Sequence, residues 1–165
     1  MDSTPEQLRF ASIPGCTIRA DFAGGGLSSD LGPLLLKGVD RQIGLTERVC
    51  AAIDDTRHPG YITHSLHDIL KQRIYQIASG YEDGNDCNSL RHDPMFRLGV
   101  GCKPFDSDDA EGALASGSTI SRFEHAVSSK DIYRLSEALV DQFIAGYATP
   151  PQALVLDIDH SEDAV

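Results

Sequence analysis

The chain has 165 residues, of which 41% are hydrophobic and 24% charged, with 25 acidic side chains against 14 basic ones. This composition is ordinary for one soluble globular domain, and the length excludes a large catalytic domain together with a separate recognition domain. No run of about 18 apolar residues and no basic-then-apolar leader is present, so we expect a cytoplasmic protein with no membrane partner. The net charge of −11 argues against nucleic-acid binding. The excess acid lies in residues 104–165, however, whereas residues 37–103 carry nine basic and nine acidic groups.

The first predicted elements are a strand and two helices. Residues 16–22 alternate apolar and polar side chains, which is typical of a half-buried strand. Asp30 is suited to cap a helix that continues to Ile43 and ends at Gly44. Thr46 restarts a short helix that reaches Ile53, and a polar loop covers residues 54–60.

The strongest helical pattern begins at Ser65, which with Asp68 forms an aspartate version of the capping box. One face of this helix is apolar and should be buried: Leu66, Ile69, Leu70, Ile74, Ile77, Ala78 and Tyr81. The opposite face is polar and should meet solvent or a partner: His67, Lys71, Gln72, Arg73 and Gln76.

The second half of the chain is predicted to hold three helices and a final strand. Pro94 begins a short helix, residues 104–117 form an acidic surface linker, and a helix covers residues 120–127. Ser129 caps a longer helix with an apolar inner side made of Ile132, Leu135, Leu139, Phe143, Ile144 and Tyr147. After Pro150-Pro151, residues 153–159 are typical of a buried strand. Because such a strand needs neighbours on both sides, we expect the chain to stop at the entrance to a second domain.

Two carboxylates, Asp157 and Asp159, lie on one face of this last strand. Such a pair suits Mg2+, which prefers carboxylate oxygens, although it also suits a strand that simply leaves the core. The four cysteines, by contrast, are far apart and form no Cys-x-x-Cys pair. We therefore expect reduced thiols rather than a disulfide frame or a zinc site.

Several short motifs follow one another in an order that carries a family resemblance. They are residues 24–32 (GGGLSSDLG), 43–47 (IGLTE), 64–66 (HSL), 80–86 (GYEDGND), 90–94 (LRHDP), 114–116 (LAS), 119–124 (TISRFE) and 154–159 (LVLDID). Together they resemble the N-terminal part of bacterial insertion-sequence transposases of the DDE class (DDE domain group 1).

The resemblance implies a mainly α chain that ends in the first strand of an incomplete RNase H-like α/β domain. Its parts would be an N-terminal strand region (1–23), a helical DNA-engaging region (24–103), the acidic linker (104–117), a helical pair (118–149) and the truncated start of the catalytic domain (150–165). Asp159 would be the first acid of an Asp-Asp-Glu triad, with Asp157 as the alternative. In the complete enzyme, Mg2+ held by these acids would support cutting and rejoining of DNA. Since the other two acids should lie downstream, we expect this chain alone to be inactive.

The implied partner is the DNA of the transposon's terminal inverted repeats, bound by a homodimer. The candidate contacts are the basic side chains on or near the predicted helices: His64, His67, Lys71, Arg73, Arg91 and Arg122. The alternative for each is a solvated helix face. Two other functions stay open: a stand-alone DNA-binding or dimerisation module, and a non-functional remnant of a transposase gene.

Overall fold

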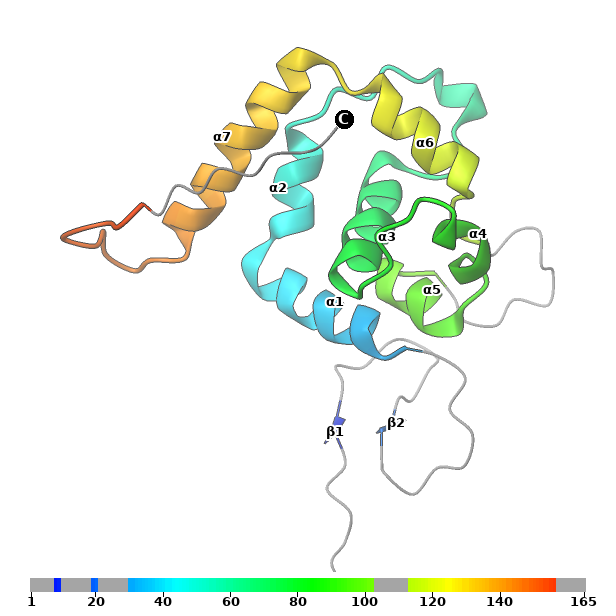
Figure 1. Cartoon of the computed structure of the whole chain (residues 1–165), viewed down its shortest axis with the longest axis horizontal. Helices are drawn as coiled ribbons and strands as arrows, with labels where there is room; N and C mark the ends of the chain where they lie inside the picture. The colour runs from blue at the N-terminus through cyan, green and yellow to red at the C-terminus, as the bar shows by residue number, and fades with distance from the viewer. Residues whose placement is uncertain (1–7, 10–18, 21–29, 103–112, 157–165) are drawn as a thin grey trace, which may run out of the picture.

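The computed structural model describes residues 8–9, 19–20, 30–102 and 113–156. This part of the chain is mainly helical, and Figure 1 shows most of its helices gathered around α3, with α7 lying beside α2. The helices are α1 (Gly32–Ile43), α2 (Leu45–Ala51), the 3-10 turn η1 (Pro59–Tyr61), α3 (Leu66–Ala78), α4 (Asp86–Leu90), α5 (Pro94–Val100), α6 (Gly117–Ala126) and α7 (Ser129–Ala145). Two-residue strands, β1 (Leu8–Arg9) and β2 (Arg19–Ala20), pair antiparallel.

The helix ends follow from local sequence. Gly44 takes a left-handed backbone conformation, with φ of 68°, and separates α1 from α2. The Ser65 hydroxyl accepts a hydrogen bond from the Asp68 N–H and so caps α3 as predicted. A full capping box starts α7, but its cap is Ser128 rather than the predicted Ser129. At α1 the prediction was also off by one residue, because the cap is Leu31 while the Asp30 carboxylate accepts from the Gly32 N–H.

The core lies where α3 meets its neighbours α1, α2 and α5. Tyr75 of α3 and Phe96 of α5 are both almost fully buried in one cluster. A second cluster joins Ile69 of α3 to Ile120 of α6, so α6 belongs to the same body as α3. Within the described residues, the helical region and the first helix of the predicted helical pair therefore pack together.

One close approach fixes the angle between α1 and α5. Gly99 of α5 lies against Pro33 of α1, and a Cβ atom at Gly99 would stand 2.8 Å from the Pro33 Cβ. Only glycine lets the two backbones come this near without a shift. Gly99 is thus a packing contact inside α5.

The polar face predicted for α3 was wrong at two positions. Gln72 and Gln76 are 2% and 0% exposed. The Gln72 amide donates to the Ala115 carbonyl at 2.8 Å and accepts from the Ala115 N–H at 2.9 Å, while Gln76 accepts from the Cys87 thiol. The hydrogen bonds to Ala115 satisfy both ends of the buried Gln72 amide. Gln76 is covered from α4 and is satisfied only at its oxygen, since its Nε2 is buried without a partner among the described residues. At the helix end the reverse holds, since Ile77 is exposed.

The segment that is hydrogen-bonded to Gln72 also differs from the prediction of an exposed linker. Ala113, Leu114 and Ala115, which fall at the end of the predicted acidic linker, are buried. Leu114 also donates its N–H to the Arg91 carbonyl at 2.9 Å. The rest of the predicted linker lies outside the described residues.

The apolar side predicted to be internal on α7 is exposed in this structure. Leu135 is partly buried against α2 and α3, but five of the six predicted inner residues are open to solvent: Ile132, Leu139, Phe143, Ile144 and Tyr147. The reason is that α7 packs along α2 through another face, which contains the buried Asp131 and Ala138. We call the exposed side the α7 apolar face.

The two predicted strands are covered only in part. Of residues 16–22, the structure describes Arg19 and Ala20, which form β2. Of residues 153–159 it describes 153–156, which form no strand and are exposed. Within the described residues no helix has the length and apolar character needed to cross a membrane.

Candidate nucleic-acid interface

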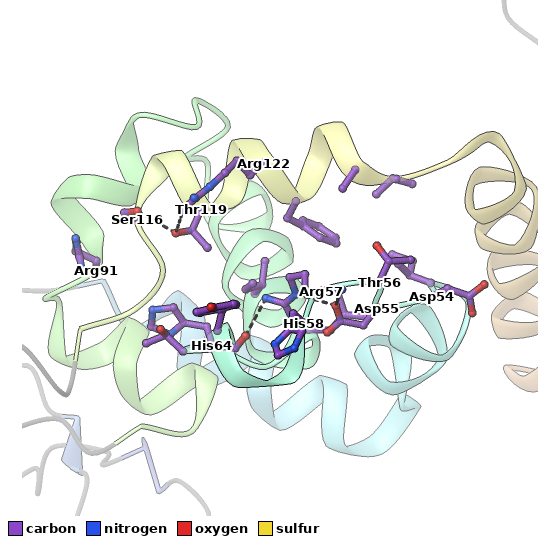
Figure 2. A pocket seen from close by; sticks show the side chains of 18 residues that line it. Asp54, Asp55, Thr56, Arg57, His58, His64, Arg91, Ser116, Thr119 and Arg122 are labelled. Atoms are coloured by element: carbon purple, nitrogen blue, oxygen red, sulfur yellow. Dashed lines mark hydrogen bonds and ion pairs between the residues drawn. The ribbon is translucent and has the colours of Figure 1, made fainter.

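A cavity of about 470 Å3 opens between the loop that precedes α3 and helix α6. Figure 2 shows that its labelled side chains come from parts of the chain far apart in sequence: the 54–64 loop, the residue after α4, and α6 with the residue before it. The apolar floor includes Leu66, Ile69 and Phe123. The polar lining includes Arg57, His58, His64, Arg91, Ser116, Thr119 and Arg122.

The loop wall is held by a planar ion pair. The Arg57 guanidinium contacts the Asp55 carboxylate through two nitrogens, at 2.7 and 2.6 Å, and donates to the His64 carbonyl at 3.0 Å. These contacts raise the pKa of Arg57 and lower that of Asp55. Pro59-Gly60 then turns the chain, with the His58 ring nitrogen accepting from the Gly60 N–H at 3.1 Å. The loop is therefore ordered by its own side chains and needs no ligand to define it.

One end of the cavity is basic, formed by His64, Arg91 and Arg122 (Figure 2). Burial, and next to it the Arg91 charge, hold the pKa of His64 below its ordinary value, so its ring is neutral at pH 7. The Arg91 Nε is buried without a hydrogen-bond partner among the described residues. Arg122 is exposed and reaches the Ser118 carbonyl and the Thr119 hydroxyl. The end therefore presents positive charge and unused donors.

The opposite end holds Asp54 and Asp55, but both acids are already engaged by arginines. Asp55 pairs with Arg57, and Asp54 pairs with Arg134 of α7 at 2.8 Å. No ion pair involves Arg91 or Arg122 within the part of the chain that the structure describes. The uncompensated charge of the cavity is therefore positive, although the whole chain carries −11.

A comparison with protein families matches residues 10–165 to a family described as transposase DDE domain group 1. The chain belongs to this transposase family. The predicted resemblance is thereby confirmed. Neither a curated protein nor a solved structure matches the chain. Family membership implies DNA as the substrate, and DDE transposases generally use a divalent metal ion.

The transposase fold brings three of the six predicted DNA contacts together, namely His64, Arg91 and Arg122. Arg73 instead forms an ion pair with Glu124 at 2.7 Å. His67 lies on another side of α3, where its Nε2 is 2.9 Å from the Thr46 hydroxyl. His64 and His67 therefore do not share a ligand.

Lys71, the remaining predicted contact, is half-buried on α3. Its charge acts on Lys37 of α1, whose pKa is lowered by burial and by the charges of Arg41 and Lys71. This places Lys71 in a second, smaller basic group near α1 and away from the cavity lining.

Sequence reasoning missed several lining residues of the transposase cavity. Arg57, His58 and Tyr61 carried a signal, since a basic and aromatic loop next to the strongest helix is suited to nucleic acid. Ser116 and Thr119 carried none beyond their suitability as helix caps. They meet the loop only because Gln72 fixes the chain just before α6.

The predicted metal ligands of the transposase, Asp157 and Asp159, lie outside the described residues. Within those residues no group of three or more His, Cys, Asp or Glu side chains is placed to hold a metal ion. Cys87, His92 and Cys102, which are side chains of types that can bind a metal, are among the residues searched and form no such group. The chemistry of the Asp157–Asp159 pair nevertheless suits Mg2+, because both side chains offer the hard oxygen ligands that this ion prefers.

Proposed function

We propose that this chain provides the DNA-end-binding part of an insertion-sequence transposase that cuts and rejoins DNA by metal-dependent phosphoryl transfer. The observation that carries the proposal is the basic end of the cavity. Three separate segments bring His64, Arg91 and Arg122 to one place on an acidic chain. The two arginines carry the positive charge beside the neutral His64 ring, and no acid among the described residues forms an ion pair with either of them. Such uncompensated charge is what a DNA phosphate requires.

The proposed contact is to the phosphate backbone of the terminal inverted repeat. Arg122 is exposed and can meet a phosphate of a duplex that lies across the cavity mouth. Arg91 lies deeper, with an unpartnered Nε, and suits a phosphate that enters the cavity. Arginine is favoured for this task because its planar guanidinium binds phosphate oxygens through two parallel hydrogen bonds.

The proposed catalytic residues are Asp159 and, as the alternative, Asp157. They would hold Mg2+ as part of a carboxylate triad within an RNase H-like domain, and the bound ion would supply charge stabilisation at the transferred phosphate. Two acids do not complete a triad. We therefore propose that the 165-residue chain binds DNA ends but does not nick them, and Mg2+-dependent nicking by the purified chain would refute this.

The binding proposal is tested by titrating the full chain into a fluorescent terminal-repeat duplex and a scrambled duplex at several salt concentrations. We expect tighter binding to the repeat and an affinity that falls steeply with salt. Arg91→Gln and Arg122→Gln should each weaken binding and reduce the salt slope by about one. The matched control is Arg41→Gln, which removes the same charge at an exposed position of α1 that does not line the cavity. An equal loss in the control would show only a general charge effect.

A stand-alone dimerisation module is the second candidate, and the α7 apolar face favours it. Ile132, Leu139 and Phe143 lie along this face and are each about half exposed or more. An apolar patch of this kind often marks a protein interface. Sedimentation of the full chain, with and without DNA, tests whether it forms the proposed homodimer. Equal affinity for all DNA, or none, together with a monomer at all concentrations, would leave only the gene-remnant interpretation.

A further inference from the structure

We infer that the cavity binds one unstacked nucleotide, with its phosphate at Arg91 and Arg122 and its base against Tyr61 and His58. The inference rests on the proposed function in one respect, since it takes DNA as the source of that nucleotide. The same chemistry would accept a free nucleotide. The features that carry it are the cavity size, the aromatic pair at the loop and the buried Arg91 Nε, which has no partner among the described residues.

The cavity is the size of a small-ligand site. Its volume of about 470 Å3 lies within the range of about 300–1,000 Å3 that is typical of such sites. A stacked duplex cannot enter a space of this size and can only lie across it. A single nucleotide that has left the stack can enter.

The loop offers an aromatic surface that the fold does not use. Tyr61 is 88% exposed, and its ring lies 5.2 Å from the His58 ring. Both residues line the cavity. An exposed tyrosine beside a basic site is the usual platform for a nucleobase, since every base has a π-face and stacking needs no particular sequence.

The rest of the lining matches the other groups of a nucleotide. The Arg91 Nε is buried without a partner, and Arg122 is exposed at the same end, so both can meet phosphate oxygens. The Ser116 and Thr119 hydroxyls, 3.1 Å apart, can bond to sugar or phosphate oxygens. The Asp55–Arg57 pair is held by its own hydrogen bonds and gives a fixed wall. The lining thus offers cations for a phosphate and aromatic rings for a base.

The test compares three DNA probes with the full-length chain: a paired duplex, the same duplex with one extrahelical 2-aminopurine, and a single strand. Free dAMP is titrated separately. We expect the extrahelical and single-stranded probes to bind at least about fivefold more tightly than the paired duplex, as one stacked base contributes that much. The 2-aminopurine fluorescence should change on binding.

Three variants identify the platform. Tyr61→Ala should remove the preference for unpaired probes and the fluorescence change, while leaving affinity for the paired duplex nearly unaltered. Tyr61→Phe keeps the ring and should retain both. Tyr133→Ala removes a tyrosine that is 67% exposed on α7, outside the cavity, and should have no effect.

The outcomes separate the inference from the proposed function. The nucleotide site is overturned if the paired and unpaired probes bind with equal affinity, or if Tyr61→Ala lowers the affinity for both equally. The proposed binding to DNA ends is not affected by either result. Binding of dAMP that depends on Tyr61, without any DNA binding, supports the site and refutes the proposed function. If dAMP competes with the extrahelical probe, free nucleotides share the site, whereas failure to compete assigns it to DNA. Absence of binding to every probe overturns both.

Discussion

The hydrogen bonds between Gln72 and Ala115 are expected to hold the α6 wall of the cavity, and Gln72→Leu tests this. The substitution replaces the amide with an apolar side chain of similar size and removes both hydrogen bonds, of 2.8 and 2.9 Å. Ala115 is 1% exposed, so its N–H and carbonyl would be left buried without partners. Each unsatisfied group costs about 1–3 kcal/mol, so the free energy of unfolding should fall by about 2–6 kcal/mol. That is a large part of the about 5–15 kcal/mol typical of a domain.

Urea unfolding followed by far-UV circular dichroism measures this loss. A decrease of about 3 kcal/mol should lower the urea midpoint by about 1–3 M. The matched control is Gln42→Leu, the same change at an exposed position of α1. An unchanged midpoint for Gln72→Leu, or an equal decrease for the control, would refute the reasoning. In the folded fraction, DNA affinity should also fall, because α6 carries Thr119 and Arg122.

Three further predictions follow from the packing and the charges. Gly99→Ala should destabilise the chain by about 1–3 kcal/mol, since its new Cβ would stand 2.8 Å from the Pro33 Cβ. Gly38→Ala, with open space around it, should instead stabilise α1 by up to about 1 kcal/mol. Thermal melts that rank the two variants the other way would contradict the close α1–α5 contact. The pKa of Asp131 is held below its ordinary value, first by the Ser128 hydrogen bonds and then by Arg134. The ionised carboxylate therefore contributes fully to the free energy of unfolding above about pH 4, and this contribution is lost as the pH falls below that value. Asp131→Asn should flatten the acid side of a curve of stability against pH, and an unchanged acid side would exclude this role. Deletion of residues 153–165 should raise solubility without lowering the melting temperature, because residues 154–156 are exposed; loss of the cooperative melt would show that this segment supports the helices.

The identity of the family could be established from sequence alone. Ordered motifs over most of the chain predicted a DDE transposase, and the family match over residues 10–165 agrees. The helix ends were also predictable, as at Gly44, Ser65 and Pro94, because caps and stops act through the backbone within one turn.

Burial was less predictable, since it depends on what packs onto a helix from elsewhere. Gln72 and Gln76 have polar side chains that suit solvent, yet both are buried, Gln72 by hydrogen bonds to Ala115 before α6 and Gln76 by one from Cys87 of α4. The α7 apolar face has the pattern of a core face, yet α7 meets α2 through the side that contains Asp131 and Ala138. Helical periodicity shows that a face is apolar and does not show which neighbour covers it.

The cavity was decided by tertiary structure alone. His64, Arg91 and Arg122 were each candidates from the sequence, as were His67, Lys71 and Arg73, and nothing in their spacing divided the two groups. Their separation follows from packing: Glu124 of α6 neutralises Arg73, the Thr46 hydroxyl contacts His67, and Arg91 and Arg122 face one cavity without an acid beside them. Charge composition is a property of the chain, whereas an uncompensated positive site arises only when folding places arginines together and engages the nearby acids elsewhere.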